Sequence, residues 1–117
     1  MTTTEQITNV ATALGWSVET DASRPGFTEF EFRQYTPAGQ DFGFSVEMRN
    51  GDPDSLLQEL EKYYEAYDSD YEAYLWSGTD GHGKNGAPYH IKDIVSDMEA
   101  AEAMIDTLYE TLKTALK

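Results

Sequence analysis

The chain of 117 residues contains no cysteine. This absence excludes disulfide scaffolds, cysteine nucleophiles and thiolate zinc sites together. A chain of this length buries about two thirds of the surface that its unfolded form exposes, so one hydrophobic core can stabilise it without a disulfide or a metal. We therefore expect a single domain over residues 1–117 that needs no cofactor.

Long apolar runs are also missing. The N-terminal residues 1–5 (MTTTE) include neither a basic region nor an apolar stretch. No later segment approaches the roughly 20 apolar residues of a membrane span. The sequence thus predicts neither a secretory signal nor a transmembrane helix, and we expect a cytoplasmic protein.

Basic residues are scarce: 8 Lys and Arg stand against 22 Asp and Glu, which gives a formal net charge of -14. Nucleic-acid phosphates need Lys and Arg to replace their counterions, and anionic membranes attract basic segments. We therefore expect no direct binding to nucleic acid or to a membrane. The favoured partner is a basic protein surface.

The pattern of apolar residues predicts an α+β fold, with a three-stranded antiparallel meander covered by helices in the order α-β-β-β-α-α-α. Thr4 is the expected N-cap of the first helix, and Gly15 can end that helix in a left-handed conformation. The expected elements are a helix over 4–14, a β-meander over 16–49, helices within 53–76, a glycine-rich loop over 78–88, and one or two helices within 90–116.

The strongest strand signal is a hairpin, because apolar residues alternate with polar ones on both sides of residues 36–40. Pro37 can open a type I turn, and Gly39 can take the left-handed position that closes it. Only pairings whose residue numbers sum to an even value place the apolar residues of both strands on one face. The simplest register places Thr36 opposite Gln40, Phe32 opposite Phe44, and Phe30 opposite Val46.

Two helix starts are predicted after the hairpin. Asp52 is the expected cap of the first, with Pro53 at its first position. Ser69 and Glu72 have the spacing of a capping box for a second, short helix. The apolar stripe of the first helix is Leu56, Leu57, Leu60, Tyr63, Tyr64 and Tyr67. The expected buried residues of the second are Tyr71, Tyr74 and Leu75.

The C-terminal segment repeats apolar residues every seven positions, at Ile91, Met98, Ile105 and Leu112, accompanied by Ile94, Ala101, Leu108 and Ala115. One continuous helix here would be about 39 Å long. Ser96 and Glu99 form another capping-box pair, so a short helix followed by a longer one fits equally well. We expect this stripe to pack inside the monomer, because the phenylalanine face of the sheet needs a helical cover.

The glycine-rich loop resembles a Walker A loop, but its last position is Asn85 where Ser or Thr would bind Mg²⁺. Residues 85–88 (NGAP) also break the helix that must follow a phosphate-binding loop. We therefore interpret the segment as a surface loop. His82 and His90 match no metal-ligand spacing and are interpreted as solvated or structural.

The acids Asp68, Asp70 and Glu72 could in principle surround a calcium ion. An EF-hand loop needs glycine at its sixth position, and counting from Asp68 that position is Ala73. Carboxylates also favour the positive N-terminus of a helix. A helix start explains these acids better, and no metal site is expected.

Tyrosine is frequent, with eight residues in the chain, five of them between positions 63 and 74. Such a cluster can form an interaction surface, because Tyr offers a large area at a small entropy cost. It can also form the edge of a core with its hydroxyls reaching water. The second interpretation is favoured for Tyr63, Tyr64 and Tyr67, and both stay open for Tyr71 and Tyr74.

The negative charge is concentrated in residues 52–72, where eight acids and one lysine give a net charge of -7. Asp54, Glu61, Glu65 and Asp68 are expected on the helix face opposite the leucines, where like charges at i,i+4 spacing repel. A solvated helix usually intersperses lysines, but only Lys62 is present. The predicted partner-binding residues are Asp54, Glu61, Glu65, Asp68, Asp70, Glu72, Tyr71 and Tyr74.

The run YTPAGQDFGF at residues 35–44, followed by an acidic helix, resembles small uncharacterised proteins of phages and conjugative elements, which often occur beside antirestriction genes. The resemblance covers about residues 27–76 and, more loosely, 88–112. It implies mobile-element biology and no particular activity. Double-stranded RNA-binding domains and type III secretion chaperones begin with a similar order of elements. The first need a basic helix N-terminus, and the second carry further strands where this sequence has only helix.

These features predict a non-catalytic interaction protein, because no acid–base pair or nucleophile–base set can be identified. The leading hypothesis is a nucleic-acid mimic that fills the basic groove of a host defence nuclease or another nucleic-acid-binding protein, of the anti-restriction or anti-CRISPR type. The alternative is a small chaperone or adaptor that binds an apolar segment of its partner. A monomer and a homodimer are both compatible with the sequence.

Overall fold

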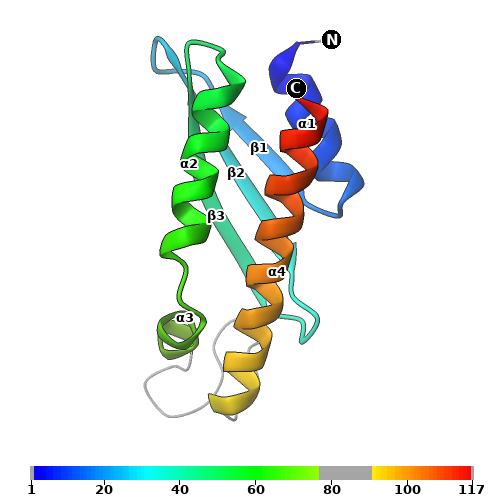
Figure 1. Ribbon diagram of the computed structural model, residues 1–117, viewed down its shortest axis with the longest axis vertical. Coiled ribbons are helices and arrows are strands. Elements are labelled where there is room, and N and C mark those ends of the chain that lie inside the picture. The colour runs from blue at the N-terminus through cyan, green and yellow to red at the C-terminus, as the bar shows by residue number, and fades with distance from the viewer. Residues whose placement is uncertain (1, 77–90, 117) are drawn as a thin grey trace.

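The computed structural model describes residues 2–76 and 91–116 (Figure 1). The glycine-rich loop 78–88, with its Walker-like run and His82, lies outside the described residues, as does His90. The elements confirm the predicted α+β class and order. They are α1 (Thr3–Ala13), β1 (Ser17–Asp21), β2 (Phe27–Tyr35), β3 (Asp41–Arg49), α2 (Pro53–Ala66), α3 (Ser69–Trp76) and α4 (Ile91–Ala115).

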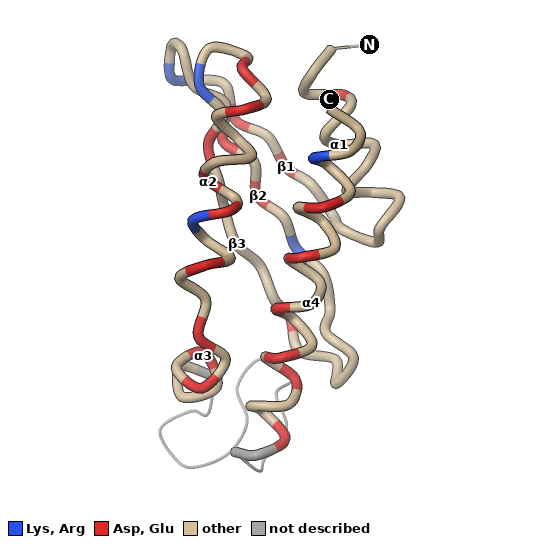
Figure 2. The backbone as a smooth tube through the Cα atoms, in the orientation of Figure 1, with Lys and Arg blue, Asp and Glu red and all other residues tan. Residues whose placement is uncertain are grey.

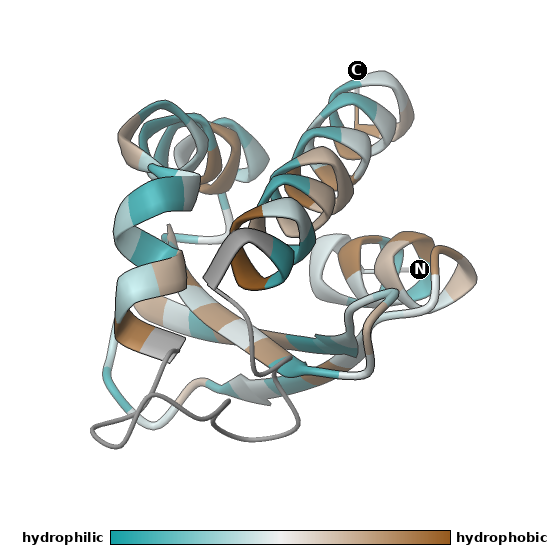
Figure 3. Ribbon diagram, turned by 90° about the horizontal axis from the view of Figure 1, so that it is seen from below, coloured by the Kyte–Doolittle hydropathy of each residue, from teal (hydrophilic) through white to brown (hydrophobic). Residues whose placement is uncertain are grey.

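The three strands form one antiparallel sheet in the order β1-β2-β3, and α1, α2 and α4 lie over one of its faces (Figure 3). Even-numbered residues of β2 and β3 point toward these helices and are buried or half-buried, whereas odd-numbered residues point to the opposite face and are mostly polar. Phe30 and Phe32 are fully buried in this layer. The core therefore lies between the sheet and the helices.

The hairpin register is the predicted one. Phe32 lies opposite Phe44, and Phe30 lies opposite Val46. The pairing continues to Thr36, whose N–H donates to the carbonyl oxygen of Gln40 at 2.9 Å. Gly39 has a φ of 89° and closes the turn, as the left-handed position requires.

Helix α1 begins at Thr3, one residue earlier than the predicted range, and its cap is Thr2, two residues before the predicted Thr4. The Thr2 hydroxyl accepts the N–H of Glu5 and donates to the Glu5 carboxylate, both at 3.1 Å. The reason is spacing: Thr2 has a glutamate three residues later, whereas the residue at that distance from Thr4 is Ile7. The predicted end is confirmed, because Gly15 has a φ of 97°.

Asp52 and Pro53 start α2 as predicted. The start of α3 was wrong by one residue, because its cap is Asp68 and not Ser69. The Asp68 carboxylate accepts the N–H groups of Asp70 at 3.0 Å and Tyr71 at 3.4 Å. A charged carboxylate at a helix N-terminus also interacts favourably with the helix dipole, which a serine hydroxyl does not.

The predicted burial of α3 was also wrong. Tyr71, Tyr74 and Leu75 are exposed by 60%, 72% and 46%, whereas Ala73 is fully buried. Helix α3 packs against α4, and Ala73 lies on the packed side. A small residue allows close approach between helices, and Tyr71, Tyr74 and Leu75 lie on the sides of α3 that face solvent.

Helix α4 is continuous, so Ser96 and Glu99 do not begin a separate helix. Its stripe is buried within the same chain from Ile94 to Leu112, as expected, whereas Ala115 is exposed and the side chain of Ile91 lies outside the described residues. None of the helices in the described ranges is both long and apolar enough to cross a membrane. The buried stripe consists of Ile94, Met98, Ala101, Ile105, Leu108 and Leu112.

Candidate acidic interaction surface

Glu61 and Glu65 of α2 lie beside α4. Glu61 was expected opposite the leucines, but its carboxylate accepts a hydrogen bond of 2.7 Å from the Tyr109 hydroxyl of α4. This contact places Glu61 on the flank of α2 that faces α4. Leu57 and Leu60 are buried on the neighbouring turn of the same helix. Glu61 therefore lies beside the apolar stripe of α2 and not on the face opposite it.

Helix α4 contributes a second row of acids along the same interhelical boundary, at Glu102, Asp106 and Glu110. The negative charges of these residues, with that of Asp106 acting most strongly, raise the pKa of Tyr64 on α2, and burial adds to this. A neutral tyrosine is favoured wherever the local potential is negative. The two helices therefore share one region of negative potential.

On α4, the pKa of Tyr109 is raised by acids of the same region. The hydrogen bond to Glu61 contributes most to raising the pKa of Tyr109 to about 12, followed by desolvation and the charges of Glu61, Glu110 and Glu65. Figure 2 shows Asp and Glu along the described length of α4 and along α2, with few Lys or Arg. We call this region the interhelical acidic surface, formed by Glu61, Tyr64, Glu65, Glu102, Asp106, Tyr109 and Glu110.

No ion pair joins an acid of this surface to a basic residue in the described part of the chain. Within residues 2–76 and 93–116, the ion pairs join Arg24 to Glu47, Arg33 to Glu31 and Asp41, and Lys62 to Glu59. Lys62 thus points to the other flank of α2. Lys113 is the nearby cation, with its ammonium 5.8 Å from the centre of the Tyr109 ring.

The remaining predicted acids do not join this surface. Asp54 is exposed at the first turn of α2, and Asp68 follows the other end of this helix, about 20 Å away. Asp68 is engaged as the cap of α3, and Asp70 follows it. Glu72 is partly buried, and its charge helps to raise the pKa values of Tyr63 and Tyr67. No group of three acids or histidines in the described part of the chain is arranged to hold a metal ion.

The tyrosines divide into two groups. Tyr63 stacks on Phe44 with ring centres 4.5 Å apart, and the Tyr67 hydroxyl donates to the Met98 carbonyl at 2.9 Å. The expectation that the Tyr67 hydroxyl reaches water was therefore wrong, because a buried backbone acceptor on α4 is within its reach. Tyr71, Tyr74 and Leu75 form an exposed group that we call the α3 apolar patch.

Sequence reasoning missed the α4 half of the interhelical acidic surface. Its signal was present: Glu102, Asp106 and Glu110 recur at i,i+4 beside the buried heptad stripe. Acids are less dense in this row than in residues 52–72, so the row is less conspicuous in the sequence. Which acids of α4 would meet α2 could not be read from either helix alone.

Two rows of carboxylates and two tyrosines lie along one boundary between helices, and the surface contains neither a nucleophile–base pair nor a cation cluster. Comparisons of the chain with protein-family models, with curated proteins and with solved structures find no match.

Proposed function

We propose that the protein is a non-catalytic acidic interaction protein whose interhelical acidic surface occupies the basic groove of a nucleic-acid-binding protein. The observation that carries this proposal is the two rows of carboxylates, which form no ion pair with a described Lys or Arg. The two rows run along neighbouring helices, as two phosphate rows border each groove of B-DNA. Two such rows imitate the paired phosphate rows that a basic groove binds.

The distribution of basic residues supports this choice of surface. The open face of the sheet is also acidic, but there Arg33 pairs with Glu31 and Arg24 pairs with Glu47. On the interhelical acidic surface the repulsion between carboxylates remains, at a cost of a few tenths of a kcal/mol per pair. A basic partner would relieve that repulsion on binding, so the arrangement favours association with such a partner.

The biological setting of the proposal comes from the hairpin at residues 35–44, which resembles that of small phage and conjugative-element proteins. A cytoplasmic inhibitor of a host defence nuclease, of the anti-restriction or anti-CRISPR type, combines this setting with the charge of the surface. A nuclease must bind nucleic-acid phosphates through Lys and Arg. Its groove is therefore a suitable target for carboxylate rows.

Capture from the native host tests the proposal. Partners held by the interhelical acidic surface should be retained at about 0.1 M salt and lost at about 1 M, where the screening length falls from about 10 Å to about 3 Å. Duplex DNA should displace them, because it competes for the same groove. Retention at 1 M salt, or no displacement by DNA, would contradict the mimic function.

A matched pair of variants distinguishes binding through this surface from an effect of the total net charge. Glu65→Gln with Asp106→Asn removes two charges from the interhelical acidic surface, and Glu19→Gln with Glu29→Gln removes two from the open face of the sheet. The first pair should weaken capture by about tenfold or more, and the second by much less, although both change the net charge equally. Equal loss in the two would show that only overall charge matters.

A second candidate function is a chaperone or adaptor that binds an apolar segment of its partner, and the α3 apolar patch favours it. Exposed aromatic side chains that lie together are enriched at protein interfaces. Binding through this patch should persist at about 1 M salt. It should be lost in Tyr71→Ala with Tyr74→Ala and retained in Glu65→Gln with Asp106→Asn, the reverse of the mimic outcome.

A further inference from the structure

Within residues 2–76 and 91–116, no strand pairs with the outer edge of β3. The hydrogen bonds at the two ends of its pairing with β2 involve even-numbered residues, since the N–H of Thr36 donates to Gln40 and the N–H of Asn50 donates to Gly26. Hydrogen-bonded pairs alternate along an antiparallel ladder. The N–H and C=O groups of Gly43, Ser45 and Glu47 therefore point away from β2, toward the outside of the sheet.

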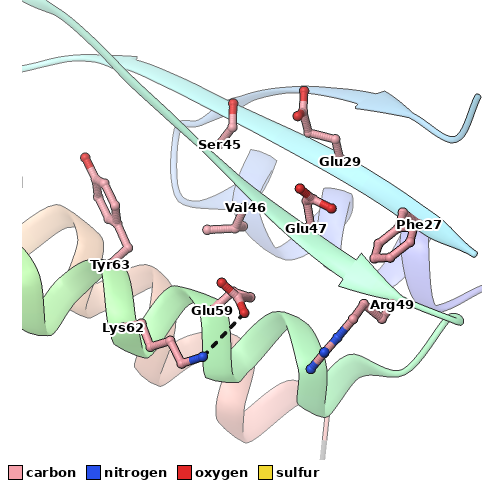
Figure 4. A pocket seen from close by; sticks show the side chains of 9 residues that line it. All are labelled: Phe27, Glu29, Ser45, Val46, Glu47, Arg49, Glu59, Lys62 and Tyr63. Atoms are coloured by element: carbon pink, nitrogen blue, oxygen red, sulfur yellow. Dashed lines mark ion pairs between the residues drawn. The ribbon is translucent and has the colours of Figure 1, made fainter. Parts of the chain in front are cut away.

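Helix α2 leaves this edge open. A groove of about 530 Å³ lies between the edge and the helix. Figure 4 shows Ser45, Glu47 and Arg49 on the strand side of it and Glu59, Lys62 and Tyr63 rising from α2. The free edge ends at Arg49, whose N–H donates to the Ser55 hydroxyl at 2.8 Å. An added strand could therefore pair with residues 43–47.

Charge along this groove is close to balanced, with Glu29, Glu47 and Glu59 beside Arg49 and Lys62, in contrast to the interhelical acidic surface. Glu47 pairs with Arg24, Glu59 pairs with Lys62, and Arg49 lies beside them. A chain with a net charge of -14 repels its own copies, and it does so less at this groove than at the interhelical acidic surface. A strongly basic partner would be drawn instead to the acidic surface, so a second copy fits this edge better.

We propose that β3 pairs antiparallel with β3 of a second copy, which extends the sheet across a two-fold axis at Ser45. Ser45 then lies opposite Ser45 of the second copy, and Gly43 lies opposite Glu47, each pair exchanging backbone hydrogen bonds. The side chains of Asp41 and Arg49 meet across the axis as unlike charges.

Neighbouring registers fit less well. A shift in one direction sets Asp41 opposite Glu47 of the second copy, and like charges directly opposite are destabilising. A shift in the other direction pairs Gly43 with the backbone of Arg49, whose N–H is already bonded to Ser55. Only the register centred on Ser45 combines free backbone groups with complementary side chains.

Crosslinking through an introduced cysteine tests this register. The chain has no cysteine, so Ser45→Cys provides a single thiol. Directly opposed hydrogen-bonded residues have Cα atoms about 5.5 Å apart, within the roughly 4.4–6.8 Å that a disulfide spans. Mild oxidation should convert most Ser45→Cys protein to a crosslinked dimer. Ser17→Cys on β1, the opposite edge of the sheet, should crosslink at least about tenfold more slowly.

Charge exchange provides the second test. Light scattering should give a mass twice the 13.2 kDa of one chain at about 0.1 mM protein. Asp41→Arg or Arg49→Asp alone should weaken the dimer by about tenfold or more, and the two together should restore it. A monomer at this concentration, equal crosslinking of the two cysteine variants, or no restoration by the double exchange would overturn the proposal.

Discussion

The Thr36 hydroxyl donates to the Asp97 carboxylate at 2.5 Å, although the two residues are 61 positions apart in the chain. The same carboxylate accepts the N–H of Ala38 at 3.1 Å. Asp97 is only 5% exposed. Helix α4 therefore holds the turn between β2 and β3 in place through one buried side chain.

Replacing that side chain should be costly. Asp97→Ala removes both acceptors and should lower the free energy of unfolding by about 2–3 kcal/mol, the range for hydrogen bonds to charged groups. Urea unfolding measures the change. Glu99→Ala, at an exposed position of the same helix, should change it by less than about 0.5 kcal/mol. Similar losses in the two variants would show that the turn does not depend on Asp97.

Two glycines with positive φ should differ in their tolerance of a methyl group. Both Gly15→Ala and Gly39→Ala force a left-handed alanine, which costs about 1–2 kcal/mol. A Cβ at Gly15 would also lie 2.3 Å from Nε2 of Gln34, whereas at Gly39 it meets nothing within 4 Å. Moving the Gln34 amide breaks its hydrogen bond to the Leu14 carbonyl.

We therefore expect Gly15→Ala to destabilise the protein by about 1 kcal/mol more than Gly39→Ala. Thermal and urea unfolding of the two variants give the comparison. In a Gln34→Ala background the difference should shrink, because the displaced amide is already absent. A difference that persists there would assign the extra cost to the backbone.

Tyr67→Phe should remove one hydrogen bond and keep the packing. The Tyr67 ring lies edge-on to Phe42 with centres 6.2 Å apart, and Phe preserves that contact. Loss of the hydroxyl leaves the Met98 carbonyl without this donor, so the free energy of unfolding should fall by about 1 kcal/mol. Tyr71→Phe, at an exposed position, is the control and should leave stability unchanged within measurement error.

Stability should also fall at alkaline pH. Burial raises the pKa of Tyr67, with the charge of Glu72 adding to it, and the same causes raise the pKa of Tyr63. Above a pH of about 10 these two tyrosines lose their hydroxyl protons in the unfolded chain and keep them in the folded chain. Their contribution to the free energy of unfolding is therefore complete below about pH 10 and declines as the pH rises. Urea unfolding at about pH 9 and 11 measures the slope, which Tyr67→Phe should reduce.

Removing charge from the interhelical acidic surface should stabilise the fold. Glu65→Gln with Asp106→Asn relieves repulsion and should raise the free energy of unfolding by about 0.5 kcal/mol at low salt, an increase that vanishes near 1 M salt. Asp54→Asn should act in the opposite direction, because Asp54 occupies the favourable first turn of α2. Stabilisation by all three substitutions would point to a general charge effect.

Features set by neighbouring residues were predictable from the sequence. The register of the β2–β3 hairpin follows from alternation and from the turn residues Pro37 and Gly39, all within one short segment. The start of α2 at Asp52 and the end of α1 at Gly15 likewise depend on local chemistry. Even the misplaced caps at Thr4 and Ser69 were wrong by only one or two residues.

Features set by contacts between distant segments were not predictable. Nothing near Glu61 indicates Tyr109, because their hydrogen bond depends on how α2 and α4 lie on the sheet. The exposure of Tyr71 and Tyr74 depends on the side of α3 that meets α4, where Ala73 allows closer approach than an aromatic ring. The α2 row of the candidate surface was thus predictable from the sequence, whereas the α4 row could be identified only from the packing of α2 and α4.

The contact between α1 and α4 has a consequence for synthesis in the cell. These are the first and last helices of the described chain, so the core cannot close until α4 leaves the ribosome. At about 5–20 residues per second, residues 50–115 take roughly 3–13 seconds to add after the hairpin is complete. During that interval the phenylalanines on the inner face of the nascent meander are exposed, and a chaperone at the ribosome has an apolar surface to bind.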